Sequence, residues 1–409
     1  MTTALRRERK TKLVSHAGKF CRRIVHVVGT LRLPLSYPHR VRCSGCYAMK
    51  LLITGGTGFI GSQLAREART HGHEVIVTGV LNNEAEQARA DRLKAAGIDV
   101  VDGSLRVPSF ARQLAQRCEG VVHLAAAQHA VNVPDQYFFD VNVEATRLLL
   151  ESCVQAKVRR FVYVSSTGVY GSAKGAAITE DTATAPDSIY GESKAAAEGV
   201  VRSFQGRIET TIARISETYG PEDLRLLKFF RAARHGVSLV VGDGRNFHQP
   251  IHVHDVARAL LLAVEHPAAN GETFLVAGPS PITSAEMLNT ISQLMKTRVR
   301  QIRLPLSPGI AAAGITERVC KRVGLQPPFH EPRLDFFRKS FWFQTSKARN
   351  VLGFEPTISF RAGVADTFNW YCSAGYLKPT HEQATQIGGH LADIKQAADA
   401  GAESLELSR

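Results

Sequence analysis

The stretch MKLLITGGTGFIGSQLAREARTHGHEVIVTG, residues 49–79, constrains the fold more than any other part of the chain. Its apolar residues 51–53 predict a short strand, and residues 63–70 predict a helix that ends at Gly72. HEVIVTG predicts the next strand. The result is a β-α-β unit of about 30 residues, with glycines at the turn from strand to helix.

Those glycines, Gly55, Gly58 and Gly61, predict a dinucleotide site. A tight turn needs a residue that tolerates positive φ, and a pyrophosphate approaches the backbone closely only where no Cβ intervenes. The following helix directs its first N–H groups at the phosphates. No acid stands near Val77–Val80 to bind a ribose 2′-hydroxyl, and the first arginine is Arg89, so NAD and NADP both stay open.

Strands and helices continue to alternate beyond this unit, through IDVVDGSL, a helix over 108–117, GVVHLAAA, a long helix within FFDVNVEATRLLLESCVQAK, and RFVYVSSTGVYG. This alternation predicts an α/β fold, a Rossmann-type doubly wound parallel sheet. Such sheets bind ligands at the carboxyl ends of their strands. The residues from His123 to Ala127 and from Ser165 to Gly171 are expected on that rim.

The stretch SIYGESKAAAEGVV places Tyr190 and Lys194 four residues apart on a predicted helix. Taken alone, this spacing is typical of any helical face with a tyrosine and a solvated lysine. The serines and threonine of SST, residues 165–167, leave a strand at the cofactor rim about two dozen residues earlier. A hydroxyl, a phenol and an ammonium are therefore expected together beside a nicotinamide.

The ordered motifs TGGTGFIG, HLAAA, NVEATRLL, VSSTGVYG, YGESK, ARISETYGP and GDGRNFHQPIHVHDVARAL resemble the extended short-chain dehydrogenases/reductases. More narrowly, they resemble the NAD-dependent epimerase/dehydratase family, over residues 49–376. The resemblance implies an enzyme with a Rossmann domain at 49–220, to which residues 251–264 return. It also implies a smaller C-terminal substrate-binding lobe at 221–376.

The resemblance also implies roles by position. Ser166, Tyr190 and Lys194 would be catalytic, with Thr167 as an alternative to Ser166 for orienting substrate. The implied cofactor-binding residues are Gly55, Gly58, Phe59, Ile60, Gly61, Leu124, Ala125, Ala126, Tyr190 and Lys194. No metal site is expected.

The expected reaction is hydride transfer at a secondary alcohol or ketone, with Tyr190 as acid/base. A free tyrosine has a pKa of about 10. A neighbouring ammonium and an oxidised nicotinamide are both expected to lower the pKa of Tyr190 toward the working pH. The alternatives are a 3β-hydroxysteroid-dehydrogenase-like reductase of an apolar substrate and a non-catalytic NAD(P) sensor.

Three positions depart from the pattern of the nucleotide-sugar enzymes. Ser104 follows Gly103 where that pattern often has an acid, and Glu217 or Thr218 replaces an asparagine. His248 stands where an arginine grips substrate phosphates, with Arg245 three residues earlier. Thr167, Arg245 and His248 are the expected substrate contacts, and the substrate is a nucleotide sugar or an apolar alcohol or ketone. His252 and His254 are expected to alternate on a strand as polar packing.

Composition bounds the remaining expectations. Residues 1–48 contain eleven Lys and Arg and one acid, Glu8, which accounts for most of the net charge of +14. A fold-wide basic surface for nucleic acid is therefore not expected. This extension is interpreted as a disordered arm, an upstream-start artefact or a targeting segment, and residues 377–409 are interpreted as a tail.

Seven cysteines and no long apolar run favour a cytoplasmic protein without a membrane segment. A homodimer is a further expectation from the family.

Overall fold

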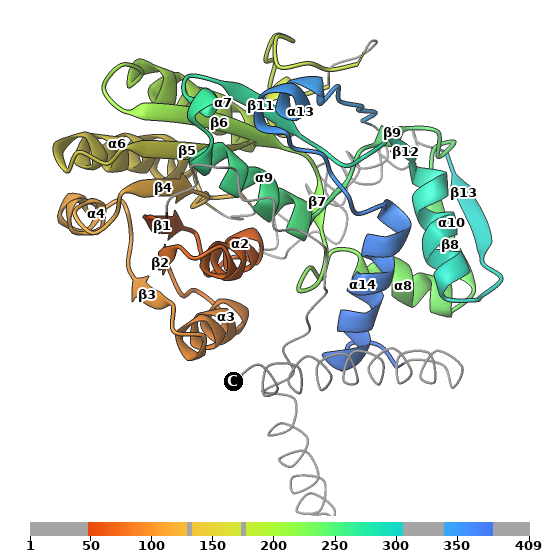
Figure 1. Ribbon diagram of the computed structural model, residues 1–409. Coiled ribbons are helices and arrows are strands. Elements are labelled where there is room, and N and C mark those ends of the chain that lie inside the picture. Colours follow the sequence, from red (N-terminus) through yellow and green to blue (C-terminus); the bar gives the residue numbers. More distant parts are fainter. Residues whose placement is uncertain (1–47, 129–132, 173–176, 306–338, 379–409) are drawn as a thin grey trace, which may run out of the picture. The chain divides into compact units, whose positions relative to one another are not determined.

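The computed structural model describes residues 48–128, 133–172, 177–305 and 339–378, which all belong to one compact unit (Figure 1). The extension and the tail predicted from the sequence lie outside these residues, apart from Ala48, Leu377 and Lys378. No helix in the described ranges combines the length and the apolar character that crossing a bilayer requires.

The centre of the unit is a seven-stranded sheet in the order β11-β6-β5-β4-β1-β2-β3. Every pairing in it is parallel. Its strands are β1 (Lys50–Thr54), β2 (Glu74–Gly79), β3 (Asp99–Asp102), β4 (Gly120–His123), β5 (Arg160–Ser166), β6 (Glu209–Ile215) and β11 (Thr273–Val276). The order reverses at β1, where Thr54 is in register with both Thr78 of β2 and His123 of β4.

Helices cover both faces of this sheet (Figure 1). On one face lie α2 (Phe59–Thr70), α3 (Glu84–Ala95) and α9 (Val253–Glu265), and on the other lie α4 (Pro108–Ala115), α6 (Ala145–Gln155) and α7 (Ile189–Ser203). Neighbouring residues of β1 divide between the two cores, since Leu51 and Ile53 pack on the first face and Leu52 on the second. A parallel strand that is covered by helices on both faces needs apolar side chains on both faces, and β1 has them. The predicted fold class is confirmed.

A smaller lobe is built from helices and short strand pairs. It contains α8 (Leu227–Arg234), α10 (Ser284–Leu294) and α14 (Phe360–Ser373), with β8 (Val237–Val241) parallel to β13 (Arg300–Leu304). A second pair, β9 (Phe247–His248) and β12 (Ile282–Thr283), is antiparallel. Phe230 of α8 stacks on Phe368 of α14 with ring centroids 5.7 Å apart, which joins the lobe's helices.

The chain crosses between the lobe and the sheet more than once. After the short pair of β7 (Thr218–Tyr219) and β10 (Ile251–His252), α9 packs against α2. β11 then adds the edge strand beside β6, and α13 (Ser346–Leu352) packs Ala348 and Leu352 into the same core. The sheet therefore takes up segments of the C-terminal half beyond residues 251–264.

One local expectation was wrong, and one helix was not predicted. His254 lies in helix α9, because the strand that carries His252 ends at that residue and the helix begins at Val253. The helix α3 was not predicted, since only Ala90 and Leu93 of its twelve residues are buried and its apolar periodicity is weak.

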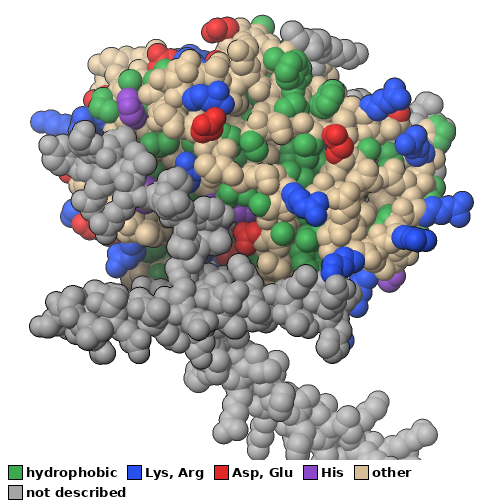
Figure 2. All heavy atoms as spheres, turned by 45° about the vertical axis from the view of Figure 1, so that its right-hand side comes forward, with side chains coloured by type: hydrophobic (Ala, Val, Ile, Leu, Met, Phe, Trp, Pro, Cys, Tyr) green, Lys and Arg blue, Asp and Glu red, His purple; other side chains and the backbone are tan. Residues whose placement is uncertain are grey.

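Charged side chains do not gather into one basic surface on the face shown in Figure 2. Lysine and arginine side chains are spread over this face, several of them along its right-hand margin, and most acidic side chains lie nearer its centre and left.

Asp255 is the main polar connection between α9 and the segment that leads into α14. Its buried carboxylate accepts hydrogen bonds from the backbone N–H groups of Thr357 and Ile358 at 2.9–3.2 Å. Arg258 and the Thr357 hydroxyl donate to the same carboxylate. It therefore satisfies two backbone donors and fixes where α14 begins.

We expect Asp255→Ala to lower the free energy of unfolding by about 3–5 kcal/mol, because it removes a buried carboxylate and leaves its donors unpaired. Urea unfolding followed by circular dichroism measures this. Asp91→Ala is the control, since Asp91 is exposed and its bond with Gln87 is worth at most about 0.5 kcal/mol. A loss below about 1 kcal/mol in Asp255→Ala would contradict the assigned role.

Candidate active site

The glycine turn after β1 fits closely against the loop after β4. Gly55 has φ +64°, and a Cβ there would lie 2.8 Å from the backbone nitrogen of Ala125. A Cβ on Gly61 would lie 2.3 Å from the Gly55 carbonyl oxygen. Gly58 is the N-cap of α2 and supplies no side chain to its first turn. The N–H groups of Phe59, Ile60 and Gly61 therefore meet no side-chain cap, and this glycine cradle fits a pyrophosphate.

The carboxyl ends of β1 and β4 are held together by His123. Its Nδ1 lies 2.6 Å from Thr54 Oγ1 and its Nε2 lies 2.9 Å from Thr146 Oγ1. Thr146 donates its hydroxyl proton to the Asn142 carbonyl, so the Thr146 oxygen is the acceptor in its contact with His123. The ring proton of His123 is therefore assigned to Nε2. Burial, with a smaller contribution from Lys194, lowers the pKa of His123 to about 3. A neutral imidazole thus fixes the switch point of the sheet.

Asn142 lies in a π-helical turn, Asp140–Glu144, between α5 (Gln136–Phe139) and α6. Its side-chain oxygen accepts from the Ala127 N–H at 2.7 Å, and its nitrogen donates to the Ala127 carbonyl and to Ser193 Oγ. One amide therefore ties the loop after β4 to helix α7. The motif NVEATRLL contained this residue, but an asparagine in an apolar helix was the only local signal of its role.

Ser166 and Tyr190 meet at the carboxyl edge of the sheet. Ser166 is the last residue of β5, and Tyr190 is the second residue of α7, whose start is capped by Ser188. Ser166 is among the groups that lower the pKa of Tyr190, so the two side chains lie close to each other. A Cβ on Gly168 would lie 3.3 Å from Ser166 Oγ and 4.0 Å from Tyr190 Cδ1, so both side chains border the same glycine.

Lys194 lies one helical turn beyond Tyr190 and is only 2% exposed. Its Nζ donates to the Val164 carbonyl at 2.7 Å and stands 4.2 Å from the centre of the Tyr163 ring. Burial lowers the pKa of Lys194 to about 7, although the charge of Glu198 opposes that shift. An amine in this state changes its charge near neutral pH.

Helix α7 is fixed to the sheet by Glu198. Its buried carboxylate receives two hydrogen bonds from Arg214 of β6, at 2.9 and 2.7 Å, and one from Ser165 of β5 at 2.7 Å. Arg202 adds a fourth at 2.8 Å. Burial alone would raise the pKa of Glu198, but the Arg214 guanidinium outweighs it and holds that pKa below its ordinary value. The ion pair is therefore formed and places Tyr190 and Lys194 against β5.

The pKa of Tyr190 shifts in the direction opposite to the expectation. Burial raises it to about 12, and the hydrogen bond with Ser166 and the charge of Arg225 only partly offset this. Lys194 is not among the groups that lower it. In the protein by itself, Tyr190 is a phenol at neutral pH, and the expected shift toward phenolate rests on a bound cation.

The expected substrate contacts lie in different surroundings. Thr167 is half-buried in the 3₁₀ turn Thr167–Tyr170, next to Ser166, and Arg245 is exposed. His248 is 1% exposed, with Nδ1 2.9 Å from a Glu217 carboxylate oxygen and Nε2 3.0 Å from Ser284 Oγ. The two replacements noted in the sequence, Glu217 and His248, are thus paired with each other.

Arg89 of α3 reaches the glycine turn, where its guanidinium lies 3.5 Å from the Thr57 carbonyl oxygen. It also donates to Glu222 at 2.8 Å, and Arg66 and Arg92 contact the same carboxylate. At the end of β2, a Cβ on Gly79 would lie 2.3 Å from Thr57 Oγ1, which leaves no room for an acidic side chain. The sequence analysis noted Arg89 only as the first arginine after the second strand, and it did not predict that Arg89 reaches the turn or that it shares Glu222 with Arg66 and Arg92.

The comparison with protein families settles the wider assignment. The model of the "NAD dependent epimerase/dehydratase family" matches residues 51–277, more than half of the chain. The chain belongs to this family. The expected enzyme class and Rossmann fold are thereby confirmed, as is a nicotinamide dinucleotide cofactor, which in a similar solved structure is NAD.

Several related proteins align with about four fifths of this chain. A dTDP-glucose 4,6-dehydratase of Xanthomonas campestris pv. campestris is 30% identical over 348 residues, 78% of this chain and 92% of its own. A 3beta-hydroxysteroid-dehydrogenase/decarboxylase (isoform 1) of Arabidopsis thaliana is 25% identical over 363 residues, 82% of each chain. Among solved structures, DesIV, a dTDP-glucose 4,6-dehydratase from Streptomyces venezuelae with NAD bound, is 26% identical with a TM-score of 0.64, covering 81% and 99%.

We expect the buried amine of Lys194 to make the stability of the cofactor-free enzyme pH-dependent. The pKa of lysine is about 10.4 in the unfolded chain and about 7 in the fold, so between these values the unfolded chain binds more protons. The stability of the wild type should therefore rise with pH through this window. Relative to Lys194→Met, we expect a gain of about 1–3 kcal/mol between about pH 7 and pH 10.

Urea unfolding at several pH values measures the difference. Lys94→Met is the control, because Lys94 is exposed on α3 and should track the wild type. Parallel pH profiles for the wild type and Lys194→Met would show that Lys194 is not desolvated.

Proposed function

We propose that this enzyme transfers hydride between a nicotinamide cofactor and a secondary alcohol or ketone, as an oxidoreductase or epimerase with Tyr190 as its acid/base. One observation carries the proposal: Ser166, Tyr190 and Lys194 meet at the carboxyl edge of the sheet that also carries the glycine cradle. The proposed cofactor contacts are the turn from Gly55 to Gly61 and the backbone from Leu124 to Ala126, which packs against it.

The three side chains divide the work at the reacting carbon. A nicotinamide, when bound, accepts or returns the hydride. The phenol of Tyr190 exchanges a proton with the substrate oxygen, and the hydroxyl of Ser166 hydrogen-bonds that same oxygen. Lys194 holds the nicotinamide ribose, and its charged form favours phenolate at Tyr190. With a nicotinamide bound to take the C–H hydride, Tyr190 would accept the hydroxyl proton of the substrate in oxidation and would return it in reduction.

The raised pKa of Tyr190 makes the direction of proton transfer depend on what is bound. With a pKa of about 12, Tyr190 holds its proton at neutral pH and can donate it to a ketone. To act as a base it needs a nearby positive charge, which protonated Lys194 and an oxidised nicotinamide ring both supply. The protein therefore couples the protonation of Tyr190 to the redox state of its cofactor.

We expect Tyr190→Phe to reduce kcat by roughly 10²–10⁴-fold while the affinity for NADH changes little, because only the proton-transfer group is removed. Ser166→Ala should lower kcat in the same direction. Steady-state kinetics on a panel of sugar nucleotides, hydroxysteroids and ketones, with NADH fluorescence titration, measures both quantities. Tyr376→Phe, at an exposed tyrosine, is the control.

Undiminished kcat in Tyr190→Phe would remove Tyr190 from the mechanism. If the wild type binds NADH but turns over no member of the panel, the non-catalytic sensor becomes the better account.

A second candidate is a reductase of an apolar alcohol or ketone, of the 3β-hydroxysteroid-dehydrogenase type. The Glu217–His248 pair favours it, because the carboxylate of Glu217 repels a diphosphate and His248 is already engaged with Glu217 and Ser284. Arginine binds phosphates in a bidentate manner that histidine cannot reproduce. The Glu217–His248 pair therefore disfavours the binding of a substrate that carries a diphosphate.

We expect the double variant Glu217→Asn/His248→Arg to bind dTDP at least tenfold more tightly than the wild type. It removes one negative charge and supplies a bidentate donor at the same place. Isothermal titration calorimetry with dTDP, in the presence of NAD, measures the change. Glu272→Asn is the control, because Glu272 is an acid paired on the surface with Lys347. Tight binding of dTDP by the wild type, unchanged in the double variant, would favour the nucleotide-sugar substrate.

We also propose a cytoplasmic location and a homodimer. Cys118, Cys153 and Cys372 are free thiols, which is usual in a reducing compartment. The dimer stays a prediction from the family.

A further inference from the structure

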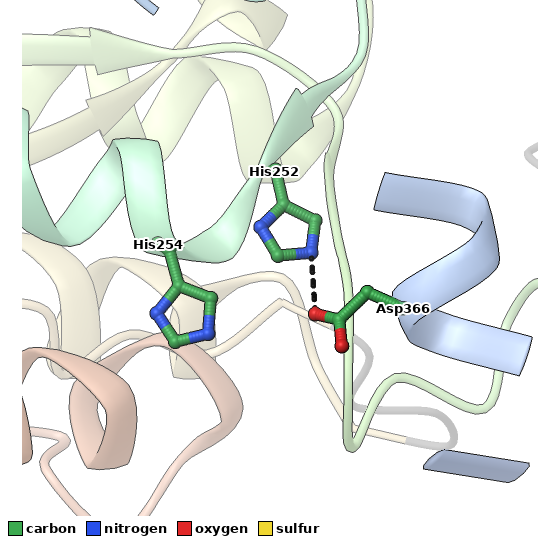
Figure 3. A group of neighbouring side chains, drawn as sticks. All are labelled: His252, His254 and Asp366. Atoms are coloured by element: carbon green, nitrogen blue, oxygen red, sulfur yellow. Dashed lines mark ion pairs between the residues drawn. The ribbon is translucent and has the colours of Figure 1, made fainter. Parts of the chain in front are cut away.

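Three side chains with metal-binding groups converge where the lobe meets helix α9 (Figure 3). His252 is the last residue of β10, His254 is the second residue of α9, and Asp366 projects from α14. One ligand atom from each lies within 4.8 Å of the others. We propose that His252, His254 and Asp366 form a binding site for a divalent transition-metal ion of the Zn²⁺ class.

The separation of the ligand atoms fits such an ion. Nε2 of His252 and Oδ2 of Asp366 are 3.4 Å apart. In a tetrahedral zinc site with ligand bonds of about 2.0–2.1 Å, neighbouring ligand atoms are separated by roughly 3.4 Å. The rings of His252 and His254 lie nearly parallel, 26° apart, with their centroids separated by 5.3 Å. Figure 3 shows a ring nitrogen of each histidine on the side facing the carboxylate. A modest rotation of His254 would complete three ligands and leave the fourth position to water.

The burial of His252 is independent support. The residue is 1% exposed, and neither ring nitrogen has a hydrogen-bond partner among the described residues. Most buried polar atoms in native proteins have a hydrogen-bond partner, so a buried imidazole without one needs an explanation. A metal ion on Nε2 would give one of the two nitrogens its partner.

Charged side chains of both signs lie near the proposed site. The carboxylate of Glu67 lies near His254 and favours a cation there. The guanidinium of Arg66 opposes a cation, but it is paired with Glu222.

Helix α14 approaches His252 as closely as its sequence permits. A Cβ on Gly363 would lie 2.8 Å from His252 Cδ2 and 2.3 Å from the Tyr219 hydroxyl oxygen. Asp366 is one turn further along, so the glycine contact brings its carboxylate beside the imidazole. An ion at this point would connect the start of α9 to α14, and with it the lobe to the nucleotide domain. Its role is therefore structural, apart from the chemistry at Tyr190.

The test uses the full chain after treatment with EDTA and removal of the chelator. Zinc is titrated in competition with a chromogenic chelator, and thermal unfolding is recorded with and without zinc. We expect the wild type to bind zinc and to gain thermal stability. In His254→Gln and Asp366→Asn we expect at least a tenfold loss of affinity at this site and most of the thermal gain to disappear.

His235→Gln is the matched control, since His235 is exposed just after the end of α8 and its replacement should leave zinc binding unchanged. Without metal, the circular dichroism spectra of the two ligand variants should match that of the wild type, which separates loss of a ligand from misfolding. Cobalt in place of zinc should give the absorption of a tetrahedral site in the wild type and in the control, and should not give it in the two ligand variants. Absence of zinc binding by the wild type, or equal binding by both ligand variants, would overturn the proposal.

Discussion

The buried ion pair between Glu198 and Arg214 is the interaction on which the placement of the site depends. Glu198 lies on α7 one turn beyond Lys194, and Arg214 lies on β6. Because the arginine is bidentate and Ser165 of β5 donates to the same carboxylate, rotation or sliding of α7 would break several charge-assisted bonds. Glu198 therefore fixes the positions of Tyr190 and Lys194, although it takes no part in the proposed reaction.

The same burial that makes this ion pair strong also sets the electrostatics of the site. Lys194 and Tyr190 are removed from water, so each favours its neutral form, with a pKa of about 7 for the lysine and about 12 for the phenol. The neutral state of His123 at the switch point follows the same rule. Without a ligand, Tyr190 and His123 are neutral at pH 7 and Lys194 is about half protonated, and a cationic ligand at the sheet edge would shift these equilibria.

Local sequence signals were sufficient for the parts of the fold that depend on neighbours along the chain. The strand, glycine turn and helix from Lys50 to Thr70 were predicted because turn geometry and apolar spacing are short-range properties. The helix that carries Tyr190 and Lys194 was predicted for the same reason.

Features that join distant segments left no local signal. Glu222 meets Arg89 across 133 residues of sequence, and Asp366 meets His252 only because the chain returns to α9. Glu198 and Arg214, although sixteen residues apart, are an acid on a helix and a base on a strand with nothing in their neighbours to mark a pair. Their partners are fixed by how the lobe and helices pack, which composition and periodicity do not specify.

The central claim is that Tyr190 faces a bound nicotinamide, and the titration of its phenol tests this most directly. Tyrosine labelled with ¹³C at Cζ, with Tyr190→Phe to assign the signal, allows its pKa to be followed by NMR with and without NAD⁺. The account predicts a pKa near 12 in the free protein and a fall below about 10 when NAD⁺ is bound. A Tyr190 signal that titrates at the same pH in both states would contradict it.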